Sequence, residues 1–346
     1  MEKNNSLNIP VTYVVFTFNQ EQYIKNALES ALNQSYSPIE ILISDDCSSD
    51  RTFEIITDLC GSYTGPNKII VQRNKENLGL VRHINKVMTQ ISNDLVIIAS
   101  GDDIARADKV GKIQEINKTT DALVIGCNPE IINQSGDRIG QFYSGSIPED
   151  FSWKGIIKRR NAGVFISAFD KKIFDQWGAL DENLPIEDQS IPFRASLMKD
   201  NAIFIIDEPL VKYRSHCASI VSSLNFARSN KNSTEIFLRK LNSHVSVHQS
   251  WFNDLESSHI SIEQKNQSLK LLKQRIERYN YLIDVMNDTV FQERLSIWKK
   301  YFLSGGSYNL KKIIYIFPAV FPSIFVVLVS SLARVKWRMK KQPLGY

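Results

Sequence analysis

The sequence predicts an α/β fold built on a mostly parallel sheet, and two observations support that prediction. Four short segments rich in β-branched, apolar residues occur within the first hundred residues, as is typical of strands that are covered on both faces. Segments with apolar residues at helical spacing separate them. Strands that alternate with helices form parallel sheets through right-handed crossovers, so we expect one such sheet with flanking helices.

The expected elements follow one another in the order that this fold requires. The strands are expected at residues 11–16, 39–44, 68–73 and 94–100. Apolar residues four positions apart predict helices at residues 23–31 and 80–91. Further helices should begin near Arg51, after the N-cap candidates Ser48 to Asp50, and near Asp108.

The next part of the chain is less regular. The segment "NQSGDRIG" at residues 133–140 predicts a hairpin or turn, because Asn and Gly favour tight turns. The segment "AIFIIDEPLVKYRSH" at residues 202–216 predicts one or two further strands.

From Asn225 onward the chain becomes polar and helical. Leu269, Leu272 and Ile276 keep a spacing of three to four residues, which predicts amphipathic helices that pack against the preceding domain. We therefore expect three parts, namely an α/β domain at residues 1–224, an amphipathic helical extension at residues 225–310 and a tail at residues 311–346.

Charge is distributed unevenly along the chain. The net charge is +5, but residues 226–346 contain 19 Lys and Arg against 8 Asp and Glu. Ile313 to Ala333 has no charged residue and is flanked by basic ones, while Pro318 and Pro322 interrupt any straight helix. We expect this tail to lie in an anionic membrane surface as a re-entrant or interfacial segment. A spanning segment and a buried helix of a soluble protein are the alternatives.

Each expected strand runs into a polar segment. "TFNQ" follows the first strand, "DDCSSD" the second, "RNKENLG" the third and "GDD" the fourth. Because the carboxyl ends of parallel strands lie at one edge of the sheet, where ligands of such sheets bind, these segments should form one ligand site. The four cysteines lack C-x-x-C spacing, so neither a zinc site nor a disulfide framework is expected.

Asp102 and Asp103 end the fourth strand as two adjacent carboxylates. Like charges that lie partly out of water repel one another, so the pair favours a positively charged partner. Mg²⁺ and Mn²⁺ take oxygen ligands and often bind one or two carboxylates together with substrate phosphates. We therefore expect a divalent cation that holds a diphosphate. The alternative is that both acids cap the helix that begins near Asp108.

Two further acid pairs offer chemistry, each with a structural alternative. Asp45 and Asp46 can accept hydrogen bonds from a nucleobase or a ribose, or can form a turn and a helix cap. Glu187 and Asp188 can supply a general base, although surface pairs of this kind are common.

Three basic or titratable residues remain as candidates. Arg82 can pair with phosphate oxygens or lie on a solvated helix face. Arg194 lies one to two turns after the Glu187–Asp188 pair. His216 can be a metal ligand, a phosphate donor or a structural histidine.

Five motifs together resemble those of family 2 glycosyltransferases in order and spacing. They are "VVFTFNQEQYIKNALESALNQSY", "ILISDDCSSDRT", "NLGLVRHIN", "IIASGDD" and "LDENLPIEDQSIPFR". The resemblance covers roughly residues 9–221 and is greatest to bacterial O-antigen, capsule and rhamnosyltransferase-type members. It implies the GT-A (Rossmann-like) fold and an inverting mechanism.

The resemblance also implies roles for residues of the site. Thr17 and Asp46 (or Asp45) would contact the nucleobase, Arg82 the diphosphate, and Asp102 the ribose or the metal. Asp103 would bind the metal and Asp188 would be the base. The full set of candidates comprises donor-binding Thr17, Asn19, Asp45, Asp46, Arg82, Asp102 and Arg194, metal-binding Asp103, Asp102 and His216, and catalytic Asp188 and Glu187.

Two positions depart from the commoner pattern of the family. Ser100 stands where an acid is common, three positions before the final Asp of the motif. Cys47 stands where a Gly often follows the paired acids of the second strand, and we interpret it as a small turn residue.

The expected function is transfer of a sugar from a nucleotide-diphosphate donor, UDP- or dTDP-linked, to a hydroxyl of a lipid-linked saccharide in bacterial surface polysaccharide synthesis. Mg²⁺ or Mn²⁺ would be the cofactor, an anionic membrane surface a partner, and nucleic acid no partner. The expected location is the cytoplasmic face of the bacterial inner membrane. The alternatives are a catalytically silent partner in an assembly complex and a nucleotidyltransferase.

Overall fold

A computed structural model of the chain describes residues 11–216 and 233–287. Of these, residues 11–216 and 246–272 belong to one compact unit, and residues 233–245 and 273–287 belong to a second. The first unit contains every candidate site residue. In the second unit, the rings of His244 and Tyr279 stack with their centroids 5.3 Å apart.

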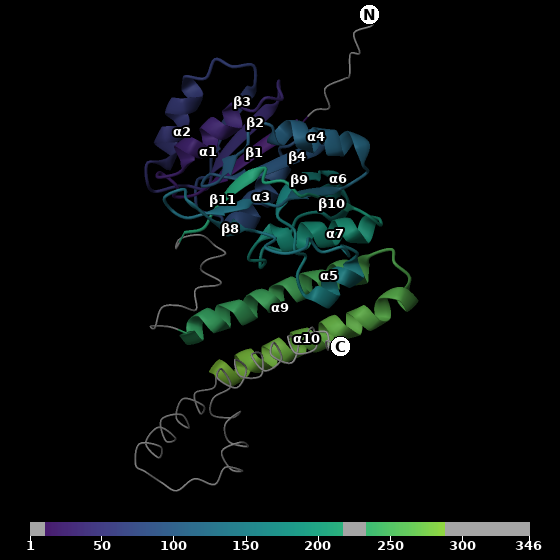
Figure 1. Ribbon diagram of the computed structural model, residues 1–346. Coiled ribbons are helices and arrows are strands. Elements are labelled where there is room, and N and C mark those ends of the chain that lie inside the picture. The colour runs from purple at the N-terminus through teal and green to yellow at the C-terminus, as the bar shows by residue number, and fades with distance from the viewer. Residues whose placement is uncertain (1–10, 217–232, 288–346) are drawn as a thin grey trace, which may run out of the picture. The chain divides into compact units, whose positions relative to one another are not determined.

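The first unit is built on a seven-stranded sheet (Figure 1). In spatial order the strands are β10 (Ile203–Ile206), β6 (Val124–Cys127), β9 (Ile166–Asp170), β4 (Leu95–Ser100), β1 (Val11–Thr17), β2 (Glu40–Asp45) and β3 (Lys68–Arg73). Only β9 runs antiparallel to its neighbours in this sheet. The prediction of a mostly parallel sheet is therefore confirmed, as are the four strands expected in the first hundred residues.

The strand register brings the polar segments together. Thr17 at the end of β1 is paired with Asp45 at the end of β2, which is paired with Arg73 at the end of β3. On the other side of β1, Phe16 is paired with Ser100 of β4. The four polar segments consequently lie along one edge of the sheet, as the sequence predicts.

Helices cover both faces of this sheet. The helical elements are α1 (Ile24–Leu32), α2 (Thr52–Gly61), α3 (Leu80–Met88), α4 (Lys109–Thr119), α5 (Trp153–Arg159), α6 (Lys172–Trp177), the 3₁₀ turn η1 (Glu187–Gln189), α7 (Ser190–Met198), α9 (Ser233–Ser257) and α10 (Ile262–Asn287). The helices expected to begin near Arg51 and Asp108 correspond to α2 and α4. Asp50 stabilises the start of α2, because its Oδ1 accepts a hydrogen bond from the Thr52 amide at 3.0 Å.

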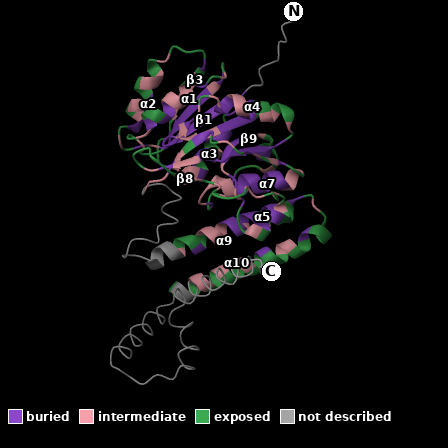
Figure 2. Ribbon diagram, viewed as in Figure 1, coloured by how far each residue is buried: buried purple, intermediate pink, exposed green. Residues whose placement is uncertain are grey.

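The apolar core has two layers, one on each face of the sheet, and Figure 2 shows the buried strands between them. Alternate residues of β1 point to opposite faces, as strand geometry requires. Val14 packs with α3, α7 and α9, whereas Tyr13 and Val15 pack with α1, α2 and α4. Burial on both faces explains why the strands are continuous apolar runs.

A second, four-stranded sheet lies beside the acid pair. Its order is β5 (Ile104–Ala105), β11 (Val211–Arg214), β7 (Glu130–Ile132) and β8 (Arg138–Gln141). The turn expected at residues 133–140 joins β7 and β8 as a hairpin. The segment at residues 202–216 forms two strands, and β10 joins the large sheet while β11 joins the small one.

Helix α9 packs on the α/β domain through residues 246–257 of its length. Trp251 is fully buried, stacks on Phe193 with ring centroids 5.1 Å apart, and donates a hydrogen bond from Nε1 to the carbonyl of Gln189 at 2.9 Å. Leu272 of α10 is also buried in this core. The predicted amphipathic helices are thus present, while the three-part division at residues 224 and 310 stays a prediction.

The predicted membrane segment, residues 313–333, lies outside the described residues. Across residues 11–216 and 233–287, no helix combines the length and the apolar character that crossing a bilayer requires.

Candidate active site

The loops after β1 and β2 are hydrogen-bonded to each other. The backbone amide of Asn19 donates to Ser48 Oγ at 2.9 Å, and its side-chain Oδ1 accepts from the Ser49 amide at 2.8 Å. Asn19 has a φ of +51° and Cys47 a φ of +63°, a left-handed conformation that favours glycine. This conformation confirms Cys47 as a turn residue and explains why a glycine suits its position.

The buried carboxylate of Asp45 stabilises the turn after β2. Its carboxylate accepts hydrogen bonds from the Ser48 amide at 2.9 Å and from Ser48 Oγ, and Arg73 Nε lies 3.2 Å from its Oδ2. Asp45 has no exposed surface. A direct contact between this carboxylate and a nucleobase stays a prediction, and the structure shows a role in building the loop.

Asp46 holds the loop between β3 and α3. Its Oδ1 accepts hydrogen bonds from Asn74 Nδ2 at 2.7 Å and from the Leu78 amide at 3.0 Å. Its Oδ2 accepts from the amide of Gly79, whose φ is +77°, at 2.9 Å. The paired acids after β2 therefore connect the second and third polar loops of the sheet edge.

Thr17 lies where β1 meets the segment after β4. It is buried, and its Oγ1 has no hydrogen-bond partner among the described residues. A Cβ on Gly101 would lie 2.9 Å from this oxygen and 2.5 Å from Gln20 Oε1. Glycine at position 101 thus allows the β1 and β4 segments to approach closely, which brings Thr17 next to the acid pair.

The acid pair after β4 is enclosed by side chains from both sheets. Asp102 accepts a hydrogen bond from Ser100 Oγ on Oδ1, and its Oδ2 lies 2.9 Å from His216 Nε2. Asp103 Oδ1 accepts from the Arg214 amide at 2.8 Å, and Arg214 Nε donates to the carbonyl of Asp102 at 3.0 Å. Both acids are buried.

Burial makes this pair costly to ionise. Loss of solvent raises the pKa of Asp103 well above its ordinary value, and the neighbouring charge of Asp102 raises it further. The nearby Lys109 is also buried and donates to the carbonyl of Ile98 at 2.9 Å. Burial lowers the pKa of Lys109 to about 8. A divalent cation at this position would relieve the repulsion between the two carboxylates, so the donor set fits one.

The prediction that His216 is a metal ligand stays a prediction. Its Nε2 faces Asp102 Oδ2. Within the part of the chain that the structure describes, no group of three or more His, Cys, Asp or Glu side chains is arranged to hold a metal ion. The contact with His216 also positions the Asp102 carboxylate. Asp102 and Asp103 remain the candidate protein ligands, in keeping with sites where phosphate oxygens complete the coordination.

The second acid pair lies in η1. Asp188 Oδ1 accepts a hydrogen bond from Gln189 Nε2 at 3.0 Å. Burial, and secondarily the charge of Glu187, raises the pKa of Asp188 to about 7. Burial also raises the pKa of Glu187. A carboxylate with a pKa near neutrality is well matched to accept a proton from a hydroxyl group.

Tyr213 connects the two acid pairs electrostatically. Burial raises the pKa of its hydroxyl, and the charges of Asp103, Asp102, Asp188 and Glu187 raise it further, in that order. This ring on β11 therefore lies close enough to both pairs to sense their charges. The structure thus brings together the two pairs that the sequence singles out, although they are 85 residues apart.

The two predicted arginines form ion pairs with acids outside the two acid pairs. Arg82 forms an exposed ion pair with Glu182, with Nε and Oε2 2.8 Å apart. Arg194 is buried, its Nε lies 3.0 Å from Asp254 Oδ2, and its Nη1 donates to the carbonyls of Gly178 and Ala179. Arg194 therefore fixes α9 to α7, and its role as a donor ligand stays a prediction.

Sequence reasoning missed three residues that support the site. Arg214 holds Asp103, the charge of Lys109 acts to lower the pKa of Asp103, and Gln189 holds Asp188. Arg214 precedes His216 by two positions, and residues two apart on a strand lie on one face. This spacing is the feature of the sequence from which Arg214 could have been predicted. Lys109 and Gln189 acquire their roles through tertiary contacts alone.

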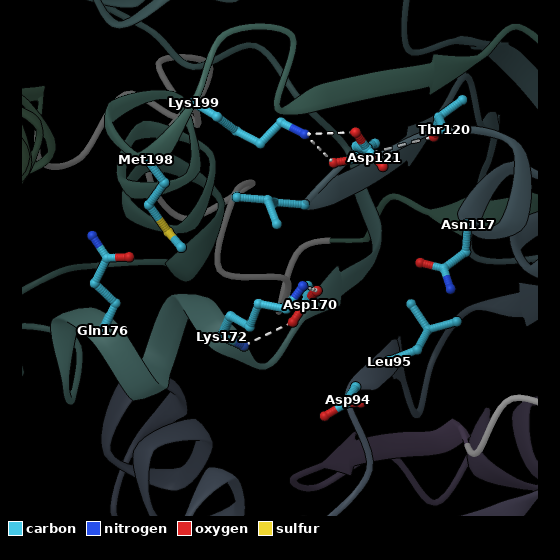
Figure 3. A pocket seen from close by; sticks show the side chains of 12 residues that line it. Asp94, Leu95, Asn117, Thr120, Asp121, Asp170, Lys172, Gln176, Met198 and Lys199 are labelled. Carbon is cyan, nitrogen blue, oxygen red and sulfur yellow. Dashed lines mark hydrogen bonds and ion pairs between the residues drawn. The ribbon is translucent and has the colours of Figure 1, made fainter.

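A groove of about 490 Å³ lies at the opposite edge of the sheet, at the start of β4 and just before β6 (Figure 3). Its charged side chains are mostly paired, since Lys172 lies 2.7 Å from Asp170 and Lys199 lies 3.5 Å from Asp121. No candidate site residue lines this groove. We place the chemistry at the carboxyl edge, where loops and acid pairs converge.

The fold and this edge define an α/β domain with hydrogen-bonded polar loops and an acid pair at the carboxyl ends of its parallel strands. The family model described as "Glycosyl transferase family 2" matches residues 12–176. This match assigns residues 12–176, just under half of the chain, to glycosyltransferase family 2.

Relatives of known sequence agree with that assignment. The putative glycosyltransferase EpsH of Bacillus subtilis is 27% identical over 228 residues, which are 61% of this chain and 62% of EpsH. The "GalNAc(5)-diNAcBac-PP-undecaprenol beta-1,3-glucosyltransferase" of Campylobacter jejuni is 25% identical over 48% of this chain and 53% of its own length. An uncharacterized glycosyltransferase of Nostoc is 28% identical over 38% of this chain and 40% of its own length. The chain therefore spans about half the length of these curated relatives.

Solved structures share the fold. Residues 1–349 of S. aureus TarS in complex with UDP-GlcNAc superimpose with a TM-score of 0.56 at 18% identity, covering 77% of this chain and 72% of that one. The mannosyltransferase PcManGT of Pyrobaculum calidifontis, in complex with GDP-Man and Mn²⁺, gives a TM-score of 0.50 at 14% identity, covering 93% of this chain and 80% of that one.

Proposed function

We propose that the protein transfers a sugar from a nucleotide-diphosphate donor, UDP- or dTDP-linked, to a hydroxyl group of a saccharide acceptor in bacterial surface polysaccharide synthesis. The observation that supports this best is that the buried pair Asp102–Asp103 and the half-buried pair Glu187–Asp188 both act on Tyr213, since the charges of all four acids raise its pKa. One pair suits a cation and a diphosphate, and the other suits proton transfer. The TarS complex with UDP-GlcNAc supports the choice of donor class.

Asp188 is the proposed general base. With a pKa of about 7 it is largely ionised at slightly alkaline pH and can accept the proton of the attacking hydroxyl. Gln189 orients the carboxylate through its hydrogen bond to Oδ1. Direct attack by the activated hydroxyl displaces the nucleoside diphosphate in one step, and such a displacement inverts the configuration of the anomeric carbon.

Asp102 and Asp103 would hold Mg²⁺ or Mn²⁺ against the donor diphosphate. When bound, the cation would neutralise negative charge on the departing diphosphate. Arg214 fixes the pair through its amide and its guanidinium, and His216 fixes the outer oxygen of Asp102. These contacts leave the acids preorganised for a cation.

The proposed acceptor is a lipid-linked saccharide, and the proposed location is the cytoplasmic face of the bacterial inner membrane. The Campylobacter jejuni relative, whose name specifies an undecaprenol-linked substrate, supports the acceptor. The basic composition of residues 226–346 supports the location, because each Lys or Arg near an anionic leaflet contributes about 1 kcal/mol. Sedimentation of the full chain with phosphatidylglycerol vesicles, but not with phosphatidylcholine vesicles, tests the location.

Nucleotide release tests the proposed activity. The full chain is incubated with UDP- and dTDP-sugars, Mn²⁺ and a bacterial lipid extract that contains lipid-linked saccharides. We expect the extract to stimulate release of UDP or dTDP, and we expect Asp188→Asn to remove this stimulation while UDP binding persists. Equal stimulation in Asp188→Asn would show that another group is the base.

A further inference from the structure

Four aromatic rings form a cluster between the two sheets, and we call Phe142, Tyr143, Phe165 and Tyr213 the aromatic cluster. The ring centroid of Phe142 lies 4.9 Å from that of Tyr143 and 5.7 Å from that of Phe165. The ring centroids of Phe165 and Tyr213 lie 5.6 Å apart. All four residues retain exposed surface, and Phe142 is 38% exposed. Large aromatic side chains that stay partly in water are typical of binding surfaces.

One end of the aromatic cluster is joined by hydrogen bonds to η1, the turn that carries the proposed base Asp188. Tyr143 donates a hydrogen bond from its hydroxyl to the carbonyl of Gly163 at 2.6 Å. The adjacent Ala162 amide donates to Gln189 Oε1 at 3.0 Å, and Gln189 Nε2 donates to Asp188 Oδ1. Three consecutive hydrogen-bonded links thus fix Tyr143 relative to Asp188.

The other end is joined to the acid pair after β4. Tyr213 precedes Arg214 on β11, and the Arg214 amide binds Asp103 Oδ1 at 2.8 Å. The aromatic cluster therefore extends from the strand that holds the proposed diphosphate site to the loop that holds the proposed base. In a direct displacement the attacking hydroxyl lies between the anomeric carbon of the donor and the base, so the acceptor must reach into this space from the side of the base.

We propose that the aromatic cluster, with Phe142 at its exposed side, binds the acceptor by stacking against a pyranose ring. This inference rests on the proposed function and names the part of the substrate that the site binds. A pyranose presents C–H groups on its faces and hydroxyl groups around its rim. It can therefore stack on an aromatic ring while one hydroxyl reaches Asp188. An acyl chain would instead place apolar atoms against the carboxylates, which is unfavourable.

Binding of simple glycosides tests this proposal without the natural acceptor. The probes are methyl and hexyl pyranosides of glucose, galactose, mannose, rhamnose and N-acetylglucosamine, measured by saturation-transfer NMR with the full chain and UDP. We expect at least one methyl pyranoside to bind, Phe142→Ala to weaken its binding at least fivefold, and Phe142→Trp to restore it. The matched control is Phe204→Ala, since Phe204 is 37% exposed on the edge strand β10, and we expect this variant to bind like the unaltered chain.

Three results would overturn the proposal. They are equal binding by Phe142→Ala and the unaltered chain, equal weakening by Phe204→Ala, and no binding of any methyl pyranoside by the unaltered chain. Displacement of hexyl pyranosides by hexanol, with methyl pyranosides inactive, would identify a lipid-chain site instead.

UDP binding is measured on the same samples. Its absence would refute the proposed donor site, whereas its persistence in Phe142→Ala separates the acceptor inference from the donor one.

Discussion

At the residue scale, the two acid pairs differ in what surrounds them. Asp102 and Asp103 are held in place by Ser100, His216 and Arg214. Asp188 instead accepts a hydrogen bond from a neutral side chain, that of Gln189. The first pair is consequently suited to hold a cation in place, and the second is suited to exchange a proton.

The pKa of Asp188 predicts how activity depends on pH. The base must be ionised, so kcat/KM should rise with pH through about 7 and then level off, and the rise should vanish in Asp188→Asn. Initial rates of nucleotide release between pH 5 and 9 measure it. A profile without an inflection between pH 6 and 8 would contradict the assignment.

The same pKa predicts that stability falls as the pH rises, whereas activity rises. The ordinary pKa of an aspartate is 3.8, so the folded state binds more protons than the unfolded state between about pH 4 and 7. The contribution of Asp188 to stability is therefore present below pH 4 and is lost as the pH rises through about 7. We expect Asp188→Asn to unfold at a higher temperature than the unaltered chain at pH 8, with no difference near pH 4.

Two arginines allow a matched comparison of buried and exposed ion pairs. Arg194→Ala leaves Asp254 buried without its partner and should lower the free energy of unfolding by about 3–5 kcal/mol. Arg82→Ala removes an exposed pair and should change it by about 0–1 kcal/mol. Urea denaturation measures both. A loss of UDP affinity in a folded Arg194→Ala protein would support the predicted role of this residue at the donor site.

At the element scale, the periodicity of the sequence predicted β1 to β4 of the large sheet but did not predict β6 and β9. β1 to β4 and the helices between them follow apolar patterns that burial on both faces produces. The small sheet could not be predicted, because its strands are short and come from segments as distant as Ile104 and Arg214. Local sequence patterns do not specify such pairings. The positions of Arg214 and Tyr213 relative to the acid pairs could therefore not be predicted.

The loop between β3 and α3 depends on Asp46. Asp46→Ala removes three hydrogen bonds to a buried carboxylate and should lower the free energy of unfolding by about 2–4 kcal/mol. Hydrogen exchange at the Leu78 and Gly79 amides should become at least tenfold faster. Glu76→Ala, an exposed change in the same loop, is the control and should alter neither quantity. Unchanged exchange in Asp46→Ala would mean that the loop is held by other contacts.

At the scale of the whole molecule, α9 completes the α/β domain instead of merely following it. Trp251 fills the core beside Phe193 and binds the carbonyl of Gln189, next to the proposed base. The sequence predicted that the amphipathic helices pack on the domain. It could not show that Trp251 and Asp254 are the points of attachment, because their partners lie about 60 residues earlier.

Removal of the Trp251 side chain tests this attachment. Trp251→Ala leaves a cavity in the core and should lower the free energy of unfolding by about 3–5 kcal/mol. Ile262→Ala, at an exposed position of α10, is the control and should have little effect. Nearly equal urea midpoints for these two variants would show that α9 contributes little to the stability of the domain.

Calorimetric titration of the full chain with UDP in the presence of Mn²⁺ tests the central claim most directly, because it asks whether the acid pair after β4 binds the nucleotide diphosphate. We predict saturable binding that EDTA removes, that Asp103→Asn weakens at least tenfold, and that Asp188→Asn leaves unchanged. UDP affinity in Asp103→Asn equal to that of the unaltered chain, with EDTA or without it, would contradict the account.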